Sequence, residues 1–509
     1  MMPPRPMLLF RPESVPGSLG FYIPATALAR ALGLVRGIIL ARLIAEQEFG
    51  LFQVGLLAVN VLNPLCGLGL NEGVARYVPM YETRGRLRSY LRQAVPFVTL
   101  VALLPSAAVF LAAEPLGRAI FQTLPAAGQA AVATTTWTTL TRIVATVTFG
   151  TVLYFLLLAI LKGLRMFRAV SLLELLMNGL FTLLTIVAAL VGFDDAASMM
   201  GGYGLTLLLL LPLFAIPLSW VIADKPGTPA IETEGNAPPL RQLIQFSAWA
   251  VVAAVIWQVL QYYPMWFLQK THGPAVTAVF GGVRLITQIV LVGAVTIIAV
   301  IQTSVNKLWE SRGRAEADRQ LLLAYKSTSM LMFAGCVLFS AFAGPIMRLF
   351  PTSFAIGVPI VSLSLLFFLI SAHLTFLSVH FALIEKMRHL FWPWTLGLAC
   401  NVLFGLWLVD PSVAPARALA GAAWAGNLAI TAALLAAIAL MRKENRPIDA
   451  GTCVFWVSMY ALALSTATQI ACLLIVLLVA VATRWIFTAD EKQELIDHCR
   501  NLARPWLKG

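Results

Sequence analysis

Apolar stretches long enough to cross a lipid bilayer recur along the whole sequence. A membrane-spanning helix needs about 20 mostly apolar residues. Such runs lie near residues 20–45, 50–78, 94–122, 128–161, 169–193, 199–223, 241–269, 275–303, 321–346, 355–384, 390–410 and 415–441. The stretch from Ala450 to Phe487 is too long for one span and predicts two short helices with a turn near Thr466–Thr468. The chain is therefore predicted to be an all-α integral membrane protein with about fourteen transmembrane helices.

The composition excludes a soluble enzyme. Of the 509 residues, 60% are hydrophobic and only 12% are charged, against the ~25% charged residues that are usual in globular proteins. Lys and Arg number 36 and Asp and Glu number 23, which gives a net charge of +13. In a membrane protein such an excess either sets the topology or lines a site for an anionic substrate. The six cysteines show no CxxC spacing, so no metal site is predicted.

Lys and Arg are concentrated in alternate loops between the predicted spans. The cation-rich segments lie near residues 84–92, 162–168, 307–319, 386–388 and 442–446. Because cytoplasmic loops carry an excess of Lys and Arg, these segments and both chain termini are predicted to be cytoplasmic.

The segment Ala223–Leu240 is rich in Pro, Gly and Glu and predicts a flexible linker. Six predicted spans precede it, and six spans with two more added at the end follow it, a division that suggests an internally duplicated transporter. EFGLF after the first span and HGPAVTAVF after the seventh agree weakly with a duplication. The predicted domains are an N-terminal lobe at 1–223, a cytoplasmic linker at 224–240, a C-terminal lobe at 241–441, and two extra spans with a cytoplasmic tail at 442–509.

Small residues and prolines give the first two spans a predicted shape. Span 1 carries Ala25, Ala29, Gly33, Gly37 and Ala41 at four-residue spacing, which lets a neighbouring helix approach closely. In span 2, a proline is followed by GLGLNEG, which predicts a kink.

Four arginines lie deep in the predicted spans: Arg30, Arg36, Arg142 and Arg284. An Arg at mid-helix costs about 2.5–3.5 kcal/mol on translocon scales, and such side chains usually face a lumen. No acidic residue lies at comparable depth, so an anion that enters the protein is the expected counter-charge. The alternative for Arg30 is that its side chain extends to the cytoplasmic interface.

Polar residues accompany two of these arginines. Thr138, Arg142 and Thr146 fall on one side of their helix and predict a polar stripe facing the lumen. Alternatively, the threonines bond back to their own helix carbonyls. Gln288 follows Arg284 at a four-residue spacing, which favours a similar polar face.

The seventh and tenth predicted spans hold further polar candidates. Gln261, with Tyr262 and Tyr263, could bind sugar hydroxyls, although the tyrosines also fit an interfacial aromatic belt. His373 and His380 are one heptad apart. Hydrogen-bonded packing is favoured for both histidines over a role in proton coupling.

Several stretches together resemble one transporter family, the bacterial polysaccharide flippases of the O-antigen (Wzx) type. This family belongs to the multidrug/oligosaccharidyl-lipid/polysaccharide exporter (MOP) superfamily, with the lipid II flippases and the multidrug and toxin exporters. The resemblance extends to about residue 441. The stretches that carry it are Ala41–Ala94, Leu161–Leu176, Ala341–Leu366, Ile384–Asp410 and Ala418–Gly426.

The motif ARALGLVRG at residues 29–37 is also similar to the S-R-x-x-G-x-x-R-D motif in span 1 of lipid II flippases. Arg30 and Arg36 match its two arginines, and the resemblance implies that Arg36 lines a central cavity and binds the substrate diphosphate. Ala29 replaces the Ser and Gly37 replaces the Asp, which argues against the lipid II branch itself. The acidic residue common in span 7 of the polysaccharide branch is also missing.

The resemblance and the four deep arginines predict a transporter rather than an enzyme. We expect a flippase that moves undecaprenyl-diphosphate-linked oligosaccharide across the bacterial cytoplasmic membrane, for surface polysaccharide such as the lipopolysaccharide O-antigen. The predicted substrate-binding residues are Arg36, Arg142, Arg284, Arg30, Gln288 and Gln261. No cofactor and no nucleic acid are expected, and coupling to H⁺ or Na⁺ is open. Besides the lipid-linked glycan and the bilayer, candidate partners are glycosyltransferases or a polymerase of the same pathway.

Two alternatives remain at this point. A cation-coupled multidrug exporter of the same superfamily would need acidic residues in its lumen, and none is found at mid-depth. A membrane-embedded polysaccharide polymerase or ligase usually has a large periplasmic loop, whereas the predicted outward loops are all short.

Overall fold

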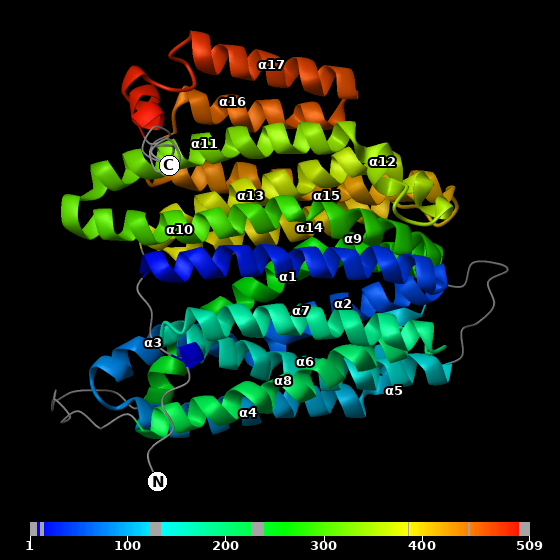
Figure 1. Cartoon of the computed structure of the whole chain (residues 1–509). Coiled ribbons are helices and arrows are strands. Elements are labelled where there is room, and N and C mark those ends of the chain that lie inside the picture. Colours follow the sequence, from blue (N-terminus) through cyan, green and yellow to red (C-terminus); the bar gives the residue numbers. More distant parts are fainter. Residues whose placement is uncertain are drawn as a thin grey trace, which may run out of the picture. The chain divides into compact units, whose positions relative to one another are not determined.

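The structure is a computed structural model that describes residues 8–10, 15–122, 134–224, 239–384, 386–445 and 448–497. All regular secondary structure in these residues is helical, and long helices run side by side (Figure 1). The predicted all-α fold is therefore confirmed.

Eleven helices of the described chain are long and apolar enough to cross a membrane. One of them, Val251–Ile298, has 48 residues, more than twice the ~20 that one crossing needs. It contains a backbone break at Gly273, whose φ of 80° is readily adopted only by glycine. This break falls between the predicted spans 241–269 and 275–303. Two shorter apolar helices, Ala450–Ala463 and Thr466–Ala482, match the predicted C-terminal pair.

The helices form two compact units. Unit 1 comprises Met1–Gly282 with Val409–Ala418, and unit 2 comprises Val283–Leu408 with Leu419–Gly509. Most of the predicted linker at 224–240 lies outside the described residues. The proposed division into lobes at this linker stays a prediction.

In unit 1, α6 is the central helix, contacted by α2, α3, α4, α5 and α8, while α1 packs along α7. Threonines can be buried on α6 because their hydroxyls donate to carbonyls of the same helix, as Thr141 does to Trp137. The elements are η1 (Leu8–Phe10), α1 (Val15–Leu43), α2 (Glu46–Gly67), α3 (Leu70–Thr83), α4 (Leu87–Leu111), α5 (Ala113–Phe121), α6 (Thr134–Gly163), α7 (Phe167–Leu190), α8 (Ala196–Asp224) and most of α9 (Pro239–Thr287).

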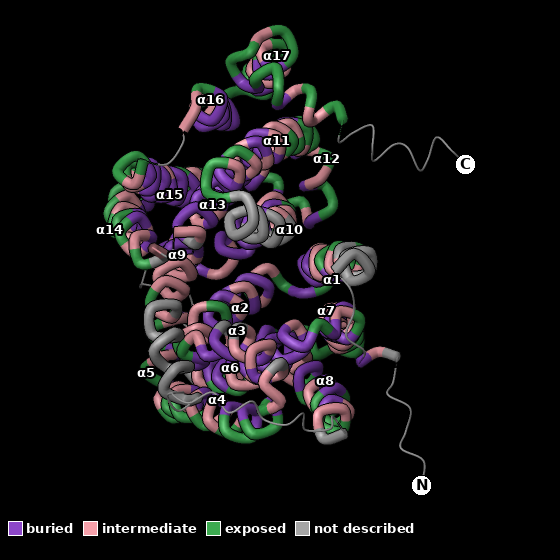
Figure 2. Tube along the Cα trace, turned by 90° about the vertical axis from the view of Figure 1, so that its left-hand side faces the viewer, coloured by how far each residue is buried: buried purple, intermediate pink, exposed green. Residues whose placement is uncertain are grey.

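In unit 2, most residues of α13 are buried (Figure 2), and α13 packs against α10 and α11. A final helical segment spans 489–497. The other elements, after the end of α9, are α10 (Ile289–Arg312), α11 (Arg314–Ala341), α12 (Ala343–Met347), η2 (Thr352–Ile360), α13 (Val361–Leu383), η3 (Met387–Leu390), α14 (Phe391–Leu408), α15 (Pro415–Lys443), α16 (Ala450–Ser458), η4 (Met459–Ala463) and α17 (Thr466–Ala482).

Two features of span 2 follow from its glycines. The kink predicted from GLGLNEG is present, because α2 ends and α3 begins across Leu68 and Gly69, both with positive φ. A methyl group at Gly50 would lie 2.0 Å from the carbonyl oxygen of Pro274. The EFGLF and HGPAVTAVF segments are thus in backbone contact, which only glycine permits.

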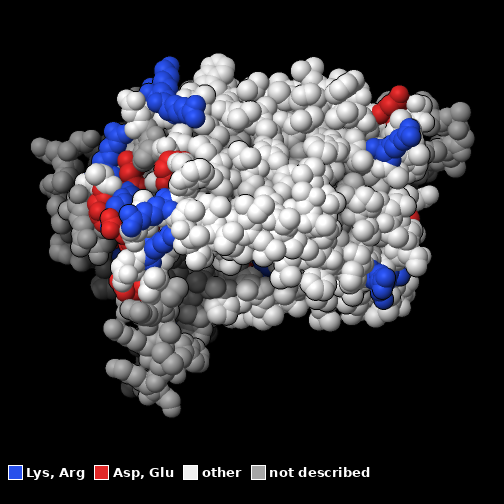
Figure 3. Space-filling model, turned by 90° about the horizontal axis from the view of Figure 1, so that it is seen from above, with Lys and Arg blue, Asp and Glu red and all other residues white. Residues whose placement is uncertain are grey.

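Charged side chains on the face that carries α17 and α11 gather at two ends. The broad area between them is almost entirely free of Lys, Arg, Asp and Glu (Figure 3). Exposed side chains of α17, such as Leu474 and Leu478, are apolar. Such a surface fits the hydrocarbon core of a bilayer.

Candidate functional site

Close packing of α1 on α7 positions Arg36. A methyl group at Gly33 would lie 3.6 Å from the Asn178 side-chain oxygen, and the Thr182 hydroxyl donates to the Leu32 carbonyl at 3.3 Å. The small-residue stripe predicted in span 1 therefore does meet a neighbouring helix. One turn further along α1, this contact brings Arg36 onto the ring of Phe181.

The surroundings of Arg36 are aromatic. Its guanidinium carbon lies 3.8 Å from the Phe181 ring centroid, and Phe181 stacks on Tyr203 of α8 at 4.5 Å. The side chain as a whole is half-buried, but its Nη1 is buried and has no hydrogen-bond partner in the described chain. A cation over a ring gains about 0.5–2 kcal/mol, which offsets only part of the cost of removing the charge from water.

The acidic residue close to this region is already neutralised. Glu174, on α7, accepts hydrogen bonds from Lys162 at 3.2 Å and from the Thr26 hydroxyl at 3.3 Å. No carboxylate of the described residues pairs with Arg36. Arg36, Phe181 and Tyr203 therefore form a partly accessible cationic cluster, which we call the Arg36 cluster, without a carboxylate partner in the described chain.

Arg30 and Arg142 lie in the same unit but do not belong to the Arg36 cluster. Both side chains are exposed. Arg142 lies 5.6 Å from the ring centroid of Phe110 on α4, and the Thr146 hydroxyl donates to the Arg142 carbonyl at 3.0 Å. The threonine follows the back-bonding alternative rather than offering its proton to a lumen. Whether either arginine contacts the substrate with Arg36 stays a prediction.

Arg284 and Gln288 belong to unit 2. Arg284 is buried, with its guanidinium carbon 5.1 and 4.9 Å from the ring centroids of Phe367 and Phe368 on α13. The next turn is fixed by a 2.6 Å hydrogen bond between Thr287 and Ser364. Gln288 is exposed. Arg284 and Arg36 thus share one local design, a guanidinium group held over phenylalanine.

Gln261 is buried, and its side-chain nitrogen has no hydrogen-bond partner in the described chain. The neighbouring Tyr262 hydroxyl accepts from Asn60 of α2 at 3.2 Å. Tyr262, Tyr263 and Trp266 line a hollow of about 220 Å³ beside α2. The lining of this hollow is aliphatic and aromatic, and Gln261 is not part of it.

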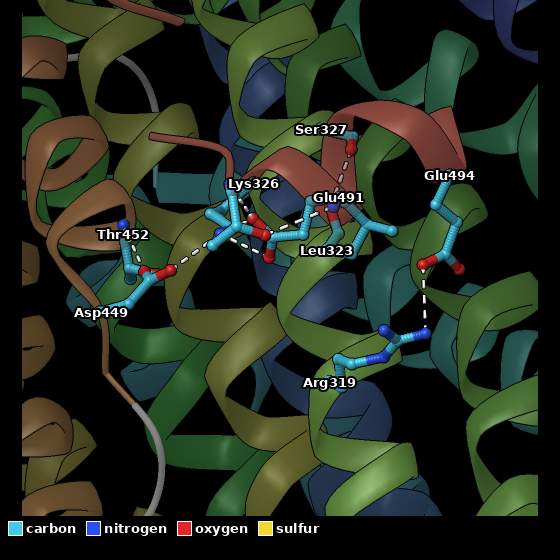
Figure 4. A network of polar contacts seen from close by, with 9 residues as sticks. Arg319, Leu323, Lys326, Ser327, Asp449, Thr452, Glu491 and Glu494 are labelled. Atoms are coloured by element: carbon cyan, nitrogen blue, oxygen red, sulfur yellow. Dashed lines mark hydrogen bonds and ion pairs between the residues drawn. The ribbon is translucent and has the colours of Figure 1, made fainter. Parts of the chain in front are cut away.

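The structure contains a charged cluster around Lys326 of α11 that was not predicted from the sequence. Lys326 is fully buried and lies 2.7 Å from a carboxylate oxygen of Asp449 and 2.7 Å from Glu491 (Figure 4). Asp449 precedes α16, and Glu491 belongs to the helical segment 489–497. The cluster therefore joins both segments to α11 of unit 2.

Helix N-termini complete the charge balance of this cluster. The Asp449 carboxylate caps α16 by accepting from the Thr452 backbone N–H at 2.8 Å. Glu491 accepts from the Thr488 N–H at 2.8 Å, in a Thr-x-x-Glu capping box. The partial positive charge of two N-termini offsets the second carboxylate. Two signals in the sequence could have indicated this cluster. One is a Lys inside the predicted span 321–346, and the other is the pair of helix-capping patterns at Asp449 and Glu491.

The two histidines of α13 differ in their contacts. His373 is buried and hydrogen-bonds to Tyr325, whose hydroxyl also accepts from Trp456 of α16 at 2.6 Å. This network is the hydrogen-bonded packing favoured from the sequence. His380 lies 3.8 Å from Asp318 of α11. In the described residues, no cluster of three or more His, Cys, Asp or Glu could hold a metal ion.

Comparison with known proteins agrees with this architecture. The family described as Polysaccharide biosynthesis protein matches residues 18–305, more than half of the chain. No curated protein matches the sequence.

Among solved structures, the lipid II flippase MurJ in an inward closed conformation is 14% identical with a TM-score of 0.64, covering 91% of this chain and 97% of that one. An inward-facing multidrug resistance MATE family transporter of the MOP superfamily is 17% identical with a TM-score of 0.60, covering 85% and 95%. A MOP superfamily transporter from Pyrococcus furiosus, whose title reports a reverse polarity of the binding pocket, is 15% identical with a TM-score of 0.60, covering 88% and 100%. The chain thus has the MOP transporter fold.

Proposed function

Because the chain belongs to the polysaccharide biosynthesis protein family, we propose that it is a flippase that moves undecaprenyl-diphosphate-linked oligosaccharide across the bacterial cytoplasmic membrane. It would be a transporter and not an enzyme, working by alternating access. Both termini would be cytoplasmic, as the distribution of Lys and Arg favours. The glycan would then serve surface polysaccharide such as O-antigen.

The observation that carries this proposal is the Arg36 cluster. A cation without a carboxylate partner, with Nη1 buried and without a hydrogen-bond partner, favours an anionic ligand. A guanidinium group can form two parallel charge-assisted hydrogen bonds with phosphate oxygens. The half-buried position of Arg36 leaves part of the side chain reachable. The diphosphate of the lipid carrier fits these requirements, with Arg142, Arg284 and Arg30 as further candidates.

The neutral polar groups support a glycan as the remaining part of the substrate. Sugars present hydroxyl groups and apolar ring faces, which bind amides and aromatic rings. Gln261 has an unused donor, and tyrosines and a tryptophan adjoin it in sequence. We therefore assign Gln261 and, in unit 2, Gln288 to contacts with the oligosaccharide.

A multidrug exporter is the second candidate, and the MATE-like fold is its support. The charge at Arg36 disfavours a multidrug exporter, because a cationic site repels the organic cations that acidic lumens attract. Glu174 cannot supply the missing acid while it is bound to Lys162. The proposal includes no cofactor. H⁺ or Na⁺ would be the coupling ion, and glycosyltransferases or a polymerase the partners.

The test replaces Arg36 in a strain whose surface polysaccharide depends on this protein. Arg36→Ala should abolish surface polysaccharide while the membrane abundance of the protein is unchanged. Arg36→Lys should retain part of the activity, because it keeps the charge but loses the planar donor pair. Arg42→Ala, an exposed position on the same helix, is the matched control. Normal polysaccharide from the Arg36→Ala strain would refute the assignment.

Reconstitution separates the two candidate functions. Proteoliposomes with the wild-type protein should move a fluorescent undecaprenyl-diphosphate-linked oligosaccharide between leaflets and should not accumulate cationic dyes. Dye transport without glycolipid movement would replace the flippase proposal with the exporter.

A further inference from the structure

Unit 1 contains a second hollow, separate from the one beside α2 and from the Arg36 cluster, which we call the α4/α8 groove. Its volume is about 690 Å³, within the ~300–1,000 Å³ of typical ligand sites. α4 and α8 form the walls and α6 forms the floor. The residues that define its character are Arg88, Arg92 and Pro96 of α4, Leu156 of α6, and Pro212 and Ser219 of α8.

Each wall of the α4/α8 groove contains a proline that lines it. Pro96 and Pro212 lie within helices that continue past them. Proline removes a backbone donor and clashes with the preceding turn, so it bends a helix and prevents close parallel packing. The floor beneath them is apolar, as Leu156 and Leu157 of α6 show.

The charge in the groove is confined to one end. Arg88 and Arg92 are one turn apart on α4, on the same helix face, at the end predicted to be cytoplasmic. Both side chains are exposed, and no carboxylate of the described chain pairs with either. Beyond them the lining is almost wholly apolar, with Thr99 and Ser219 as the neutral polar exceptions.

We propose that the α4/α8 groove binds an anionic glycerophospholipid of the cytoplasmic leaflet. The acyl chains would lie in the apolar part, and the phosphate would accept hydrogen bonds from Arg88 and Arg92. Basic pockets between membrane helices on the cytoplasmic side bind anionic lipid headgroups, and guanidinium groups bind phosphate oxygens with charge-assisted hydrogen bonds. The groove contains no residue of α1 or α7, so this site does not depend on the proposed flippase activity.

A hollow in unit 2 shows what the two arginines add. It has about 460 Å³ and is lined by apolar residues of and next to α11 and α12, among them Leu338, Phe339 and Ile346. Any lipid chain could fill it, because no lining side chain can select a headgroup. Charge complementarity with an anionic lipid is a property of the α4/α8 groove and is lacking in the hollow of unit 2.

The experiment measures lipids retained by the purified full-length protein in native mass spectrometry, after titration with phosphatidylglycerol or phosphatidylcholine. The wild type should retain phosphatidylglycerol at least about tenfold better, a difference of about 1.4 kcal/mol. The double variant Arg88→Gln/Arg92→Gln should lose this preference. Ala215→Trp should reduce retention of both lipids, because Ala215 is an exposed lining residue and Trp would fill the groove.

The matched control is Arg84→Gln/Arg86→Gln, which removes the same charge from the same predicted cytoplasmic segment outside the groove. It should retain phosphatidylglycerol as the wild type does. Equal losses in the two double variants, or no preference in the wild type, would overturn the proposal. Displacement of phosphatidylglycerol by equimolar undecaprenyl diphosphate would also overturn it, because the groove would then be a substrate site. Thermal unfolding of each variant in detergent separates lost lipid binding from misfolding.

Discussion

Lys326 of unit 2 and Arg36 of unit 1 are both cations on largely apolar helices, but their surroundings differ. Lys326 contacts two carboxylates, each at 2.7 Å, and its side chain is fully buried. Arg36 rests on an aromatic ring, with no carboxylate of the described residues beside it. Lys326 is thus neutralised by its own chain, whereas Arg36 is not.

The difference separates a structural charge from a functional one. Burying an ion costs several kcal/mol unless partners with good geometry compensate for the lost water. All the partners of Lys326 come from the chain, so the cluster holds α16 and the segment 489–497 in place. The Phe181 ring offsets only part of the cost of burying Arg36, and no carboxylate of the described chain offsets the rest, which favours an external anion. The last two predicted spans thus gain a role in the fold through Asp449 and Glu491.

The largest expected effect is a loss of stability in Lys326→Met. Removal of one partner from a buried ion cluster typically costs 3–5 kcal/mol. Because the Asp449 side chain is 34% exposed, we expect the lower end, about 3 kcal/mol. Thermal unfolding in detergent should therefore show a lower Tm, and α16 should exchange amide hydrogens faster.

The triple variant Lys326→Met/Asp449→Asn/Glu491→Gln is the control. It removes all three charges together and should recover most of the lost stability, because no carboxylate is left without a cation. An unchanged Tm in Lys326→Met would mean that the cluster is not a structural lock, and the comparison with Arg36 would fail.

Arg36→Met should change stability in the opposite direction. It removes a buried donor without a partner, whose burial costs about 1–3 kcal/mol, and loses a ring contact worth about 0.5–2 kcal/mol. The expected net result is a stabilisation of about 1 kcal/mol, seen as a higher Tm in the same assay. A marked destabilisation, like that of Lys326→Met, would show that Arg36 is held by the protein itself.

Much of the fold could be predicted because it rests on local signals. About 20 consecutive apolar residues have one stable option in a bilayer, so the spans were found without knowing their neighbours. The break at Gly273 was also visible as HGP. The helix ends were less predictable: the predicted span 94–122 is divided between α4 and α5.

The candidate site was predictable only in part. Arg36 stands out because a charge in an apolar run is conspicuous, but Phe181 and Tyr203 come from distant helices and have no local signal. Lys326 was visible as a charge within a span, yet Asp449 and Glu491 lie 123 and 165 positions further along. For Arg142, helical periodicity predicts a face but not whether that face meets a lumen or lipid.

The smallest expected effect is a pH dependence of the Lys326 cluster. Burial alone would raise the pKa of Asp449, but hydrogen bonds from Lys326 and Thr452 outweigh it, so the pKa lies below its ordinary value. A carboxyl with a depressed pKa stabilises the fold fully above its ordinary pKa of about 3.9 and loses this contribution as the pH falls through the lowered value. After correction for intrinsic rates, hydrogen exchange at α16 should therefore stay constant from pH 7 to 5, because Asp449 keeps its charge. It should accelerate below about pH 4, where Asp449 takes up a proton. In Asp449→Asn, the acid-induced acceleration should be smaller, because this carboxylate no longer takes up a proton. An equal acid response in both proteins would assign the titration to another group, such as Glu491.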